Sequence, residues 1–139
     1  MSANVSLAVI QSAYAAFGIG DIPALSTLLS EDVVWEFVGD SRAPYTGRAS
    51  GKQAVAEWFG SVAAADGIQV FEPREFFAGS DHVSVIGWER TTALATGTVF
   101  ECPWAHVWTL CDGLITRLFG ILDTEAAAAA RSSVCLGKV

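Results

Sequence analysis

Residues 98–122 read TVFECPWAHVWTLCDGLITRLFGIL, two alternating runs of residues on either side of Asp112-Gly113. Asp-Gly between two alternating runs is a strong signal for a β-hairpin, since it suits the tight turns that join antiparallel strands. The stretch therefore predicts two long antiparallel strands, 98–111 and 114–122. Together they are the largest continuous piece of the expected fold.

The rest of the chain supplies further strands and several helices. Strands are expected where apolar and polar residues alternate, and helices where apolar residues recur every three or four positions. Asp21 is expected to cap the second helix, with Pro23 in its first turn. Three helices followed by a meander of strands predict an α+β domain with the helices on one face of the sheet. The other expected elements are strands 33–38, 68–77 and 83–94 and helices 5–17, 21–29, 50–62 and 125–131, with a loop at 39–47.

Length and composition limit the possible partners. At 139 residues the chain fits one domain, expected to span 1–139 with a core at about 5–131 and a loose tail at 132–139. The net charge of −7 and the absence of any run among its eight basic residues argue against nucleic acid and an anionic membrane as partners. No apolar stretch reaches the ~18 residues of a membrane span. The N-terminus predicts a first helix instead of a signal peptide.

Cysteine and histidine give no sign of a metal or cofactor site. Cys102, Cys111 and Cys135 are an odd number without metal-type spacing, which indicates reduced thiols in a cytoplasmic protein. The two histidines, His82 and His106, do not form a ligand cluster. The sequence lacks a phosphate-cradling glycine loop and a dinucleotide fingerprint. No cofactor is therefore expected.

Aromatic residues recur at every second position of two expected strands. Trp104, His106 and Trp108 share one face of strand 98–111, and Trp88 and Arg90 share one face of strand 83–94. Periodicity groups these residues but does not say which group points inward. An aromatic stripe is more often plain core, yet an Arg and a His among the tryptophans favour a ligand cavity, since both are costly to bury unpaired.

Three segments together resemble a known family: YAAFGIGDIPALSTLLSEDVVWEFVG, YTGRASGKQAVAEWF and AHVWTLCDGLITRLFGILD. They are similar to the nuclear transport factor 2-like superfamily, in its SnoaL-like, ketosteroid isomerase-related branch. The resemblance implies a cone-shaped fold, in which a curved mixed or antiparallel sheet and three N-terminal helices enclose a pocket. It also implies a homodimer through the outer sheet face, onto which Glu36, Glu89 and Glu101 are expected to alternate.

The resemblance implies which residues line the pocket. Tyr45 is expected near its mouth, and Tyr14 is expected to reach it from the first helix. The residues expected on the sheet face of the pocket are Trp35, Phe37, Trp88, Arg90, Thr92, Cys102, Trp104, His106, Trp108, Leu118, Gly120 and Leu122.

The best-known chemistries of the superfamily lack their residues in this sequence. Ketosteroid isomerases use an Asp base and a protonated Asp that donates to the developing oxyanion. The base position falls at or next to Phe37, and the donor position falls on Cys102 or Pro103. The two Asp positions of limonene epoxide hydrolases hold Thr92 and Gly120. Neither mechanism is expected.

Two residues remain as candidates for catalysis. A histidine normally titrates in the pH range suited to proton transfer. His106 is therefore either an acid/base group or a neutral histidine of the core. Arg90 binds a ligand oxygen, or forms an ion pair with Glu36, Glu89 or Glu101. Asp123 is expected to cap the final helix; its alternative role is the acid/base that the resemblance to polyketide cyclases of this branch implies for an Asp late in the chain.

Three functions fit these features. The first is a cofactor-independent isomerase, cyclase or dehydratase acting on a polyketide-, terpenoid- or steroid-like substrate through His106. The second is a binding protein for a small hydrophobic ligand, and the third is an assembly domain with a vestigial pocket. The enzyme is the function predicted first.

Overall fold

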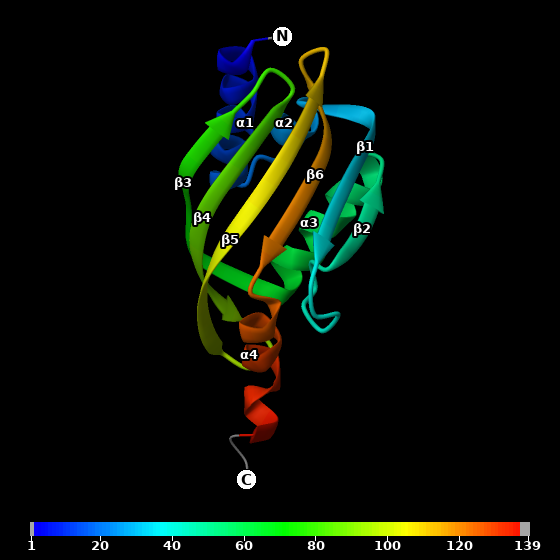
Figure 1. Cartoon of the computed structure of the whole chain (residues 1–139). Coiled ribbons are helices and arrows are strands. Elements are labelled where there is room, and N and C mark those ends of the chain that lie inside the picture. The colour runs from blue at the N-terminus through cyan, green and yellow to red at the C-terminus, as the bar shows by residue number, and fades with distance from the viewer. Residues whose placement is uncertain (1, 137–139) are drawn as a thin grey trace.

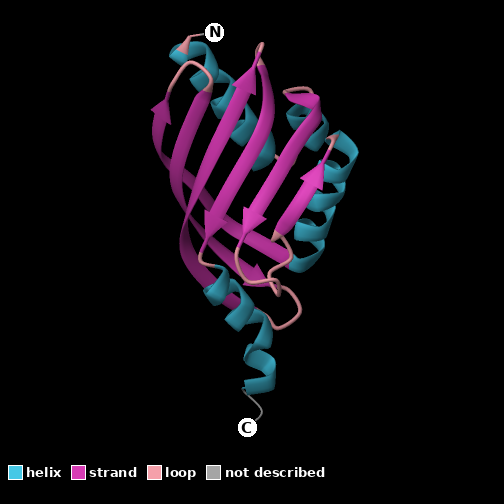
Figure 2. Ribbon diagram, turned by 45° about the vertical axis from the view of Figure 1, so that its right-hand side comes forward, coloured by secondary structure: helices cyan, strands magenta, loops and turns pink. Residues whose placement is uncertain are grey.

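The computed structural model describes residues 2–136, and side chains as far as Ser132. A curved six-stranded sheet has α1, α2 and α3 against one of its faces, and α4 extends from one end (Figure 1, Figure 2). The helices are α1 (Ala3–Gly18), α2 (Ile22–Ser26), α3 (Lys52–Ala65) and α4 (Thr124–Leu136). The strands are β1 (Leu29–Val38), β2 (Gly47–Ser50), β3 (Asp66–Ala78), β4 (His82–Ala93), β5 (Thr98–Cys111) and β6 (Leu114–Leu122).

The sheet is mixed, with the strand order β2-β1-β6-β5-β4-β3. β1 runs parallel to β6, and every other neighbouring pair is antiparallel. The predicted hairpin is confirmed, because β5 and β6 have the expected bounds and Cys111 pairs with Leu114. Its turn has positive φ at both Asp112 (51°) and Gly113 (82°), as a type I′ turn requires.

The first two helices begin at side chains that cap them. The Asp21 side chain accepts a hydrogen bond from the Ala24 N–H at 3.1 Å, as expected, and Pro23 lies in the first turn of α2. Helix α1 begins after Ser2, whose hydroxyl accepts from the Val5 N–H at 3.1 Å. It buries one stripe along its axis against the sheet, made of Ser6, Ile10, Ala13 and Ala16. This stripe holds α1 above the sheet face that carries the site.

The early elements differ from the expectation by one added strand. Three helices precede β3 and β1 lies between α2 and α3, as predicted, but β2 also lies there, within the segment where the loop and the start of the third helix were expected. The sequence does not predict β2, because Gly47–Ser50 is short and does not alternate. It forms a strand by pairing with β1, where Trp35 lies opposite Ala49.

The C-terminal helix also differs from the expectation. α4 continues to Leu136, through part of the segment expected to be a loose tail; residues 137–139 lie outside the described chain, as does the side chain of Cys135. Asp123 accepts from the Ala126 N–H at 3.1 Å, the bond expected of a cap. Within the described residues, no helix has both the length and the apolar character to cross a membrane.

Candidate functional site

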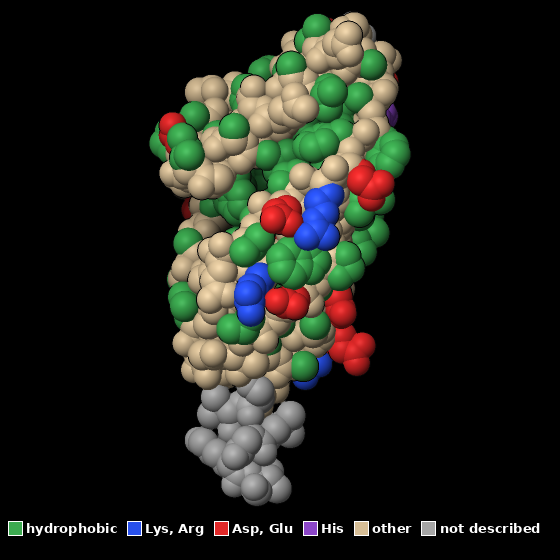
Figure 3. All heavy atoms as spheres, turned by 90° about the vertical axis from the view of Figure 1, so that its left-hand side faces the viewer, with side chains coloured by type: hydrophobic (Ala, Val, Ile, Leu, Met, Phe, Trp, Pro, Cys, Tyr) green, Lys and Arg blue, Asp and Glu red, His purple; other side chains and the backbone are tan. Residues whose placement is uncertain are grey.

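A cavity of about 80 Å³ lies between the sheet and helices α1 to α3. One buried water needs roughly 10–15 Å³ on such a measure, so the space fits several waters or a small organic molecule. Seen from the side of β3, the surface is hollowed and the hollow is walled by hydrophobic side chains (Figure 3). Residues lining the cavity are Ala13, Tyr14, Phe17, Leu25, Trp35, Phe37, Tyr45, Trp58, Phe59, Val62, Ile68, Phe71, Glu89, Trp104, His106, Trp108, Leu118 and Leu122.

The cavity wall is mainly aromatic, and nine of the side chains named from the sequence belong to it. They are Tyr14, Trp35, Phe37, Tyr45, Trp104, His106, Trp108, Leu118 and Leu122. Trp58, Phe59 and Phe71 also line the cavity but are not assigned to it from the sequence, where their spacing on α3 and β3 indicates only packing. Four of the five tryptophans in the chain line this one space.

The prediction that Trp88 and Arg90 of β4 point into the cavity is wrong. Arg90 lies on the outer face of the sheet, where its half-exposed guanidinium is 3.3 Å from a carboxylate oxygen of Glu101. Trp88 lies on the same outer face, with the Arg74 guanidinium 5.1 Å from its ring centre. Neither residue lines the cavity, so Arg90 has the structural ion pair that was its alternative role.

The inward residues of β4 are those that precede and follow Trp88. Val85, Gly87, Glu89 and Thr91 are buried, and Glu89 lines the cavity instead of facing the outer surface as expected. A glycine inside a strand often marks a close approach by a large side chain. A Cβ at Gly87 would lie 2.1 Å from Trp104 Cζ2, so the indole occupies that space. Gly87 is therefore a sequence signal from which the inner face of β4 could have been predicted.

His106 lies at the centre of a stack of aromatic rings. Its ring is 4.2 Å from Trp104 and 5.9 Å from Tyr14, both stacked, and Phe37 meets it edge-on at 5.6 Å. Burial in these surroundings lowers the pKa of His106 to about 3, because the imidazolium would lose its hydration without gaining an opposite charge. The imidazole is therefore neutral near pH 7.

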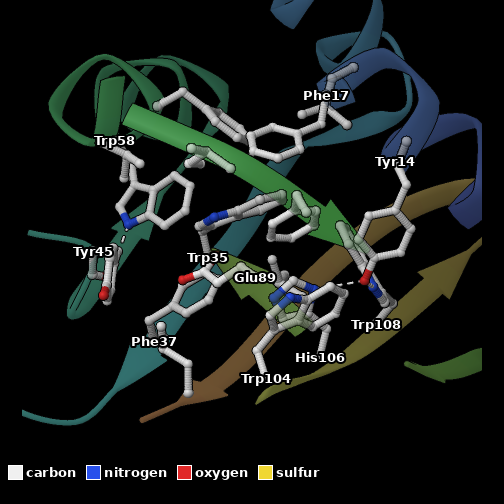
Figure 4. A pocket seen from close by; sticks show the side chains of 18 residues that line it. Tyr14, Phe17, Trp35, Phe37, Tyr45, Trp58, Glu89, Trp104, His106 and Trp108 are labelled. Atoms are coloured by element: carbon white, nitrogen blue, oxygen red, sulfur yellow. Dashed lines mark hydrogen bonds between the residues drawn. The ribbon is translucent and has the colours of Figure 1, made fainter. Parts of the chain in front are cut away.

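A chain of hydrogen bonds orients this neutral ring. The Trp108 indole N–H donates to Tyr14 Oη at 3.0 Å, and Tyr14 Oη lies 2.7 Å from His106 Nδ1 (Figure 4). Since indole only donates, the arrangement that uses every hydrogen has the Tyr14 hydroxyl donating to Nδ1. The ring proton is then assigned to Nε2, for which the described residues supply no hydrogen-bond partner. Burial also raises the pKa of Tyr14, so the phenol keeps its proton.

Glu89 brings the one formally charged side chain among the described residues that line the cavity. Figure 4 shows it projecting among the aromatic side chains, and only 6% of its surface is exposed. Burial first, and the nearby negative charge of Asp66 second, raise the pKa of Glu89 to about 7. The Cys102 thiol donates a long hydrogen bond to it, with the sulfur 3.9 Å from Glu89 Oε1.

A buried ion pair closes the end of the site near α4. Arg131 of α4 donates to the Asp66 carboxylate at 2.5 Å, and its guanidinium carbon is 5.8 Å from the ring centre of Tyr45. The Tyr45 hydroxyl is buried without a hydrogen-bond partner among the described residues, as are the indole N–H groups of Trp35 and Trp104. Each unpaired group costs about 1–3 kcal/mol.

The domain model described as SnoaL-like matches residues 10–118, which include nearly the whole cavity wall. The chain belongs to the SnoaL-like family. It is part of the nuclear transport factor 2-like superfamily, to which its solved structural neighbours also point. Curated protein sequences include no match to it.

Three solved structures illustrate the range of this SnoaL-like fold. An NTF2-like protein from Burkholderia xenovorans is 28% identical, with a TM-score of 0.86 over 94% of this chain and 98% of that one. TerC, co-crystallised with polyporic acid, is 29% identical, with a TM-score of 0.83 over 92% and 98%. A putative polyketide cyclase from Xanthomonas campestris pv. campestris is 19% identical, with a TM-score of 0.74 over 94% and 98%, and shares the fold.

Proposed function

We propose that this SnoaL-like protein binds a small hydrophobic ring compound in its aromatic cavity and rearranges it by proton transfer. The reaction class is a cofactor-independent isomerisation, cyclisation or dehydration of a polyketide-, terpenoid- or steroid-like substrate. The observation that carries this proposal is a cavity of stacked aromatic rings around the His106–Tyr14–Trp108 hydrogen-bond chain. The co-crystallisation of TerC, which is 29% identical, with polyporic acid supports a small organic ligand.

His106 has a different task here from the proton transfer that its usual pKa predicts. With a pKa of about 3 it is a weak base at neutral pH, but its Nε2–H is free to donate. A neutral imidazole can polarise a carbonyl, and a donor fixed before the reaction stabilises the negative charge that forms on oxygen. His106 is therefore the residue that holds the substrate oxygen, with Tyr14 and Trp108 positioning its ring.

Mass-spectrometric turnover of cyclic ketones, terpene epoxides and polyketide mimics tests this function. The wild type is expected to form a product, and His106→Gln is expected to slow it by about 10–1,000-fold, the range seen when an oxyanion donor is removed. Turnover that is unchanged in His106→Gln would remove His106 from the mechanism.

A non-catalytic binding protein is the second candidate. It is favoured by the neutral states of His106 and Tyr14, which give an aromatic cavity without a fixed charge on that side. Four tryptophans line the cavity, so a bound ligand quenches their fluorescence. Quenching by ligands that are recovered unaltered after long incubation would assign this second function.

The outer face of the sheet is proposed to join two copies of the chain. Ile86 of β4 and Ile121 of β6 are 43% and 48% exposed, and both pair in register with Ala105 between them. An exposed apolar row of this kind on three strands is typical of an interface. Light scattering is expected to give a dimer mass for the wild type and a monomer mass for Ile121→Glu. A wild-type monomer at micromolar concentration would contradict the dimer.

A further inference from the structure

Glu89 has the position and surroundings of a group that exchanges protons with a ligand. It faces the same cavity as His106 from the neighbouring strand, and its carboxyl lacks a strong hydrogen-bond partner, since the thiol contact at 3.9 Å is long. A structural buried carboxylate is normally paired with a cation. Here the nearby cation, Arg131, is already bound to Asp66 at 2.5 Å.

The register of the strands sets the spacing of the two groups. Glu89 is opposite Cys102 on β5, and His106 is four residues further along that strand. Four residues of strand span about 13 Å between Cα atoms, with Trp104 halfway. Both side chains line the same cavity, so a ring compound bound there can contact both of them. The phenyl ring of Phe71 stacks on the Trp104 indole, with 4.7 Å between the ring centres, and holds the indole in place.

The titratable groups around Glu89 determine which side chain in this part of the cavity can change its protonation. The titratable and charged groups around it are Asp66 of β3, Cys102 and His106 of β5, Arg131 of α4 and Tyr45 from the loop after β1. Asp66 and Arg131 neutralise each other, and burial keeps Tyr45 and Cys102 protonated, since their pKa values are raised. Glu89 is therefore the group in this cluster that is free to change protonation without breaking an ion pair.

We propose that Glu89 carries the proton in a keto–enol step on a cyclic ketone, while neutral His106 holds the ketone oxygen; this rests on the proposed function. The Glu89 carboxylate takes a proton from a carbon next to the carbonyl. The C–H bond breaks, an O–H bond forms on Glu89, and the electron pair moves to the oxygen that accepts from His106 Nε2–H. The proton then returns from Glu89 to the enolate carbon, which restores the carboxylate and the ketone; in D2O a deuteron can return in its place.

Deuterium exchange into 2-tetralone, a two-ring ketone, tests this step without knowledge of the natural substrate. In D2O the wild type is expected to exchange the hydrogens next to the carbonyl faster than buffer, at a rate that rises with pH through about 7 as Glu89 ionises. Glu89→Gln is expected to lower the rate by about 100-fold or more, as for the loss of a general base. Glu101→Gln is the matched control, since it removes an outer-face carboxylate, and its rate is expected to equal the wild type.

Tryptophan quenching by 2-tetralone separates the possible failures. Retained binding with lost exchange in Glu89→Gln supports the proposal. Retained binding and unchanged exchange in Glu89→Gln overturns the role of Glu89 and leaves the enzyme function standing. Binding to the wild type without exchange overturns proton transfer altogether and assigns a binding protein. No binding of 2-tetralone to the wild type overturns the cyclic ketone as the ligand class.

Discussion

The two faces of the central sheet carry the same residue types with opposite consequences. On the inner face, Trp104 is 3% exposed and Glu89 is 6% exposed, and both line the cavity. On the outer face, Trp88 lies under an arginine and Glu101 forms a half-exposed ion pair with Arg90. Residue type alone therefore does not show which side chains belong to the site. The strand register decides which tryptophan and which glutamate line the cavity.

The largest expected difference between the faces concerns the two tryptophans. Trp104→Ala is expected to lower the free energy of unfolding by about 3–5 kcal/mol, because it empties a large part of the core. Trp88→Ala on the outer face loses mainly a cation–π contact with Arg74, worth about 0.5–1 kcal/mol at an exposed site. Urea unfolding of both variants measures the comparison, and equal losses would contradict the assigned faces.

The next effect is a dependence of stability on pH. The pKa of Glu89 rises from 4.5 to about 7 on folding, so the folded state holds its proton more tightly. The stabilisation is complete below pH 4.5 and is lost as pH rises through 7. Relative to Glu89→Gln, the wild type is expected to lose about 3 kcal/mol between pH ~4 and pH ~8. Urea unfolding at the two pH values measures this loss. If the difference in the free energy of unfolding between wild type and Glu89→Gln does not vary with pH, the Glu89 side chain is exposed to water instead of buried.

A smaller effect on the free energy of unfolding is expected at Gly87, where β4 lies against the Trp104 indole. Gly87→Ala puts a methyl group 2.1 Å from Trp104 Cζ2, and the forced shift is expected to cost about 1–3 kcal/mol. Gly60 on α3 has nothing within 4 Å of the same position, so Gly60→Ala is expected to stabilise by up to about 1 kcal/mol. Thermal unfolding compares the two; a neutral Gly87→Ala would mean that Trp104 does not rest on β4.

The smallest effect is expected for Arg90, the cation that the sequence predicts for the site and the structure places outside it. Its ion pair with Glu101 is half-exposed, so Arg90→Met is expected to change the free energy of unfolding by about 0–1 kcal/mol. Quenching of the tryptophans by 2-tetralone is expected to stay at the wild-type level. Weaker quenching in this variant would contradict the position of Arg90 outside the cavity.

The sequence predicts much of the fold because its signals there are local. β5 and β6 have the expected bounds, since a long alternation and an Asp-Gly turn act over a few residues. Asp21 and Asp123 make the expected capping bonds for the same reason. β2 was missed because Gly47–Ser50 has no pattern of its own and becomes a strand only by pairing with β1.

The candidate site is predicted in part. His106 and its tryptophan neighbours are grouped by the alternation of their strand, and the family resemblance assigns that group to the pocket. On β4 both faces hold a charged residue, Glu89 on one and Arg90 on the other, so alternation gives no preference. The choice is made by non-local contacts: the packing of Trp104 on Gly87 and the pairing of Arg90 with Glu101. The bond between Tyr14 and His106, 92 positions apart, likewise has no local signal.

The role of the cavity depends above all on Glu89 facing it and exchanging a proton near neutral pH. Carbon-13 NMR of side-chain carboxyl groups from acidic to alkaline pH, on the wild type and Glu89→Gln, tests this most directly. One glutamate signal is expected to titrate near pH 7 in the wild type and to be missing from Glu89→Gln. A wild-type spectrum in which every carboxyl titrates at the ordinary glutamate pKa of about 4.3 or below would contradict it.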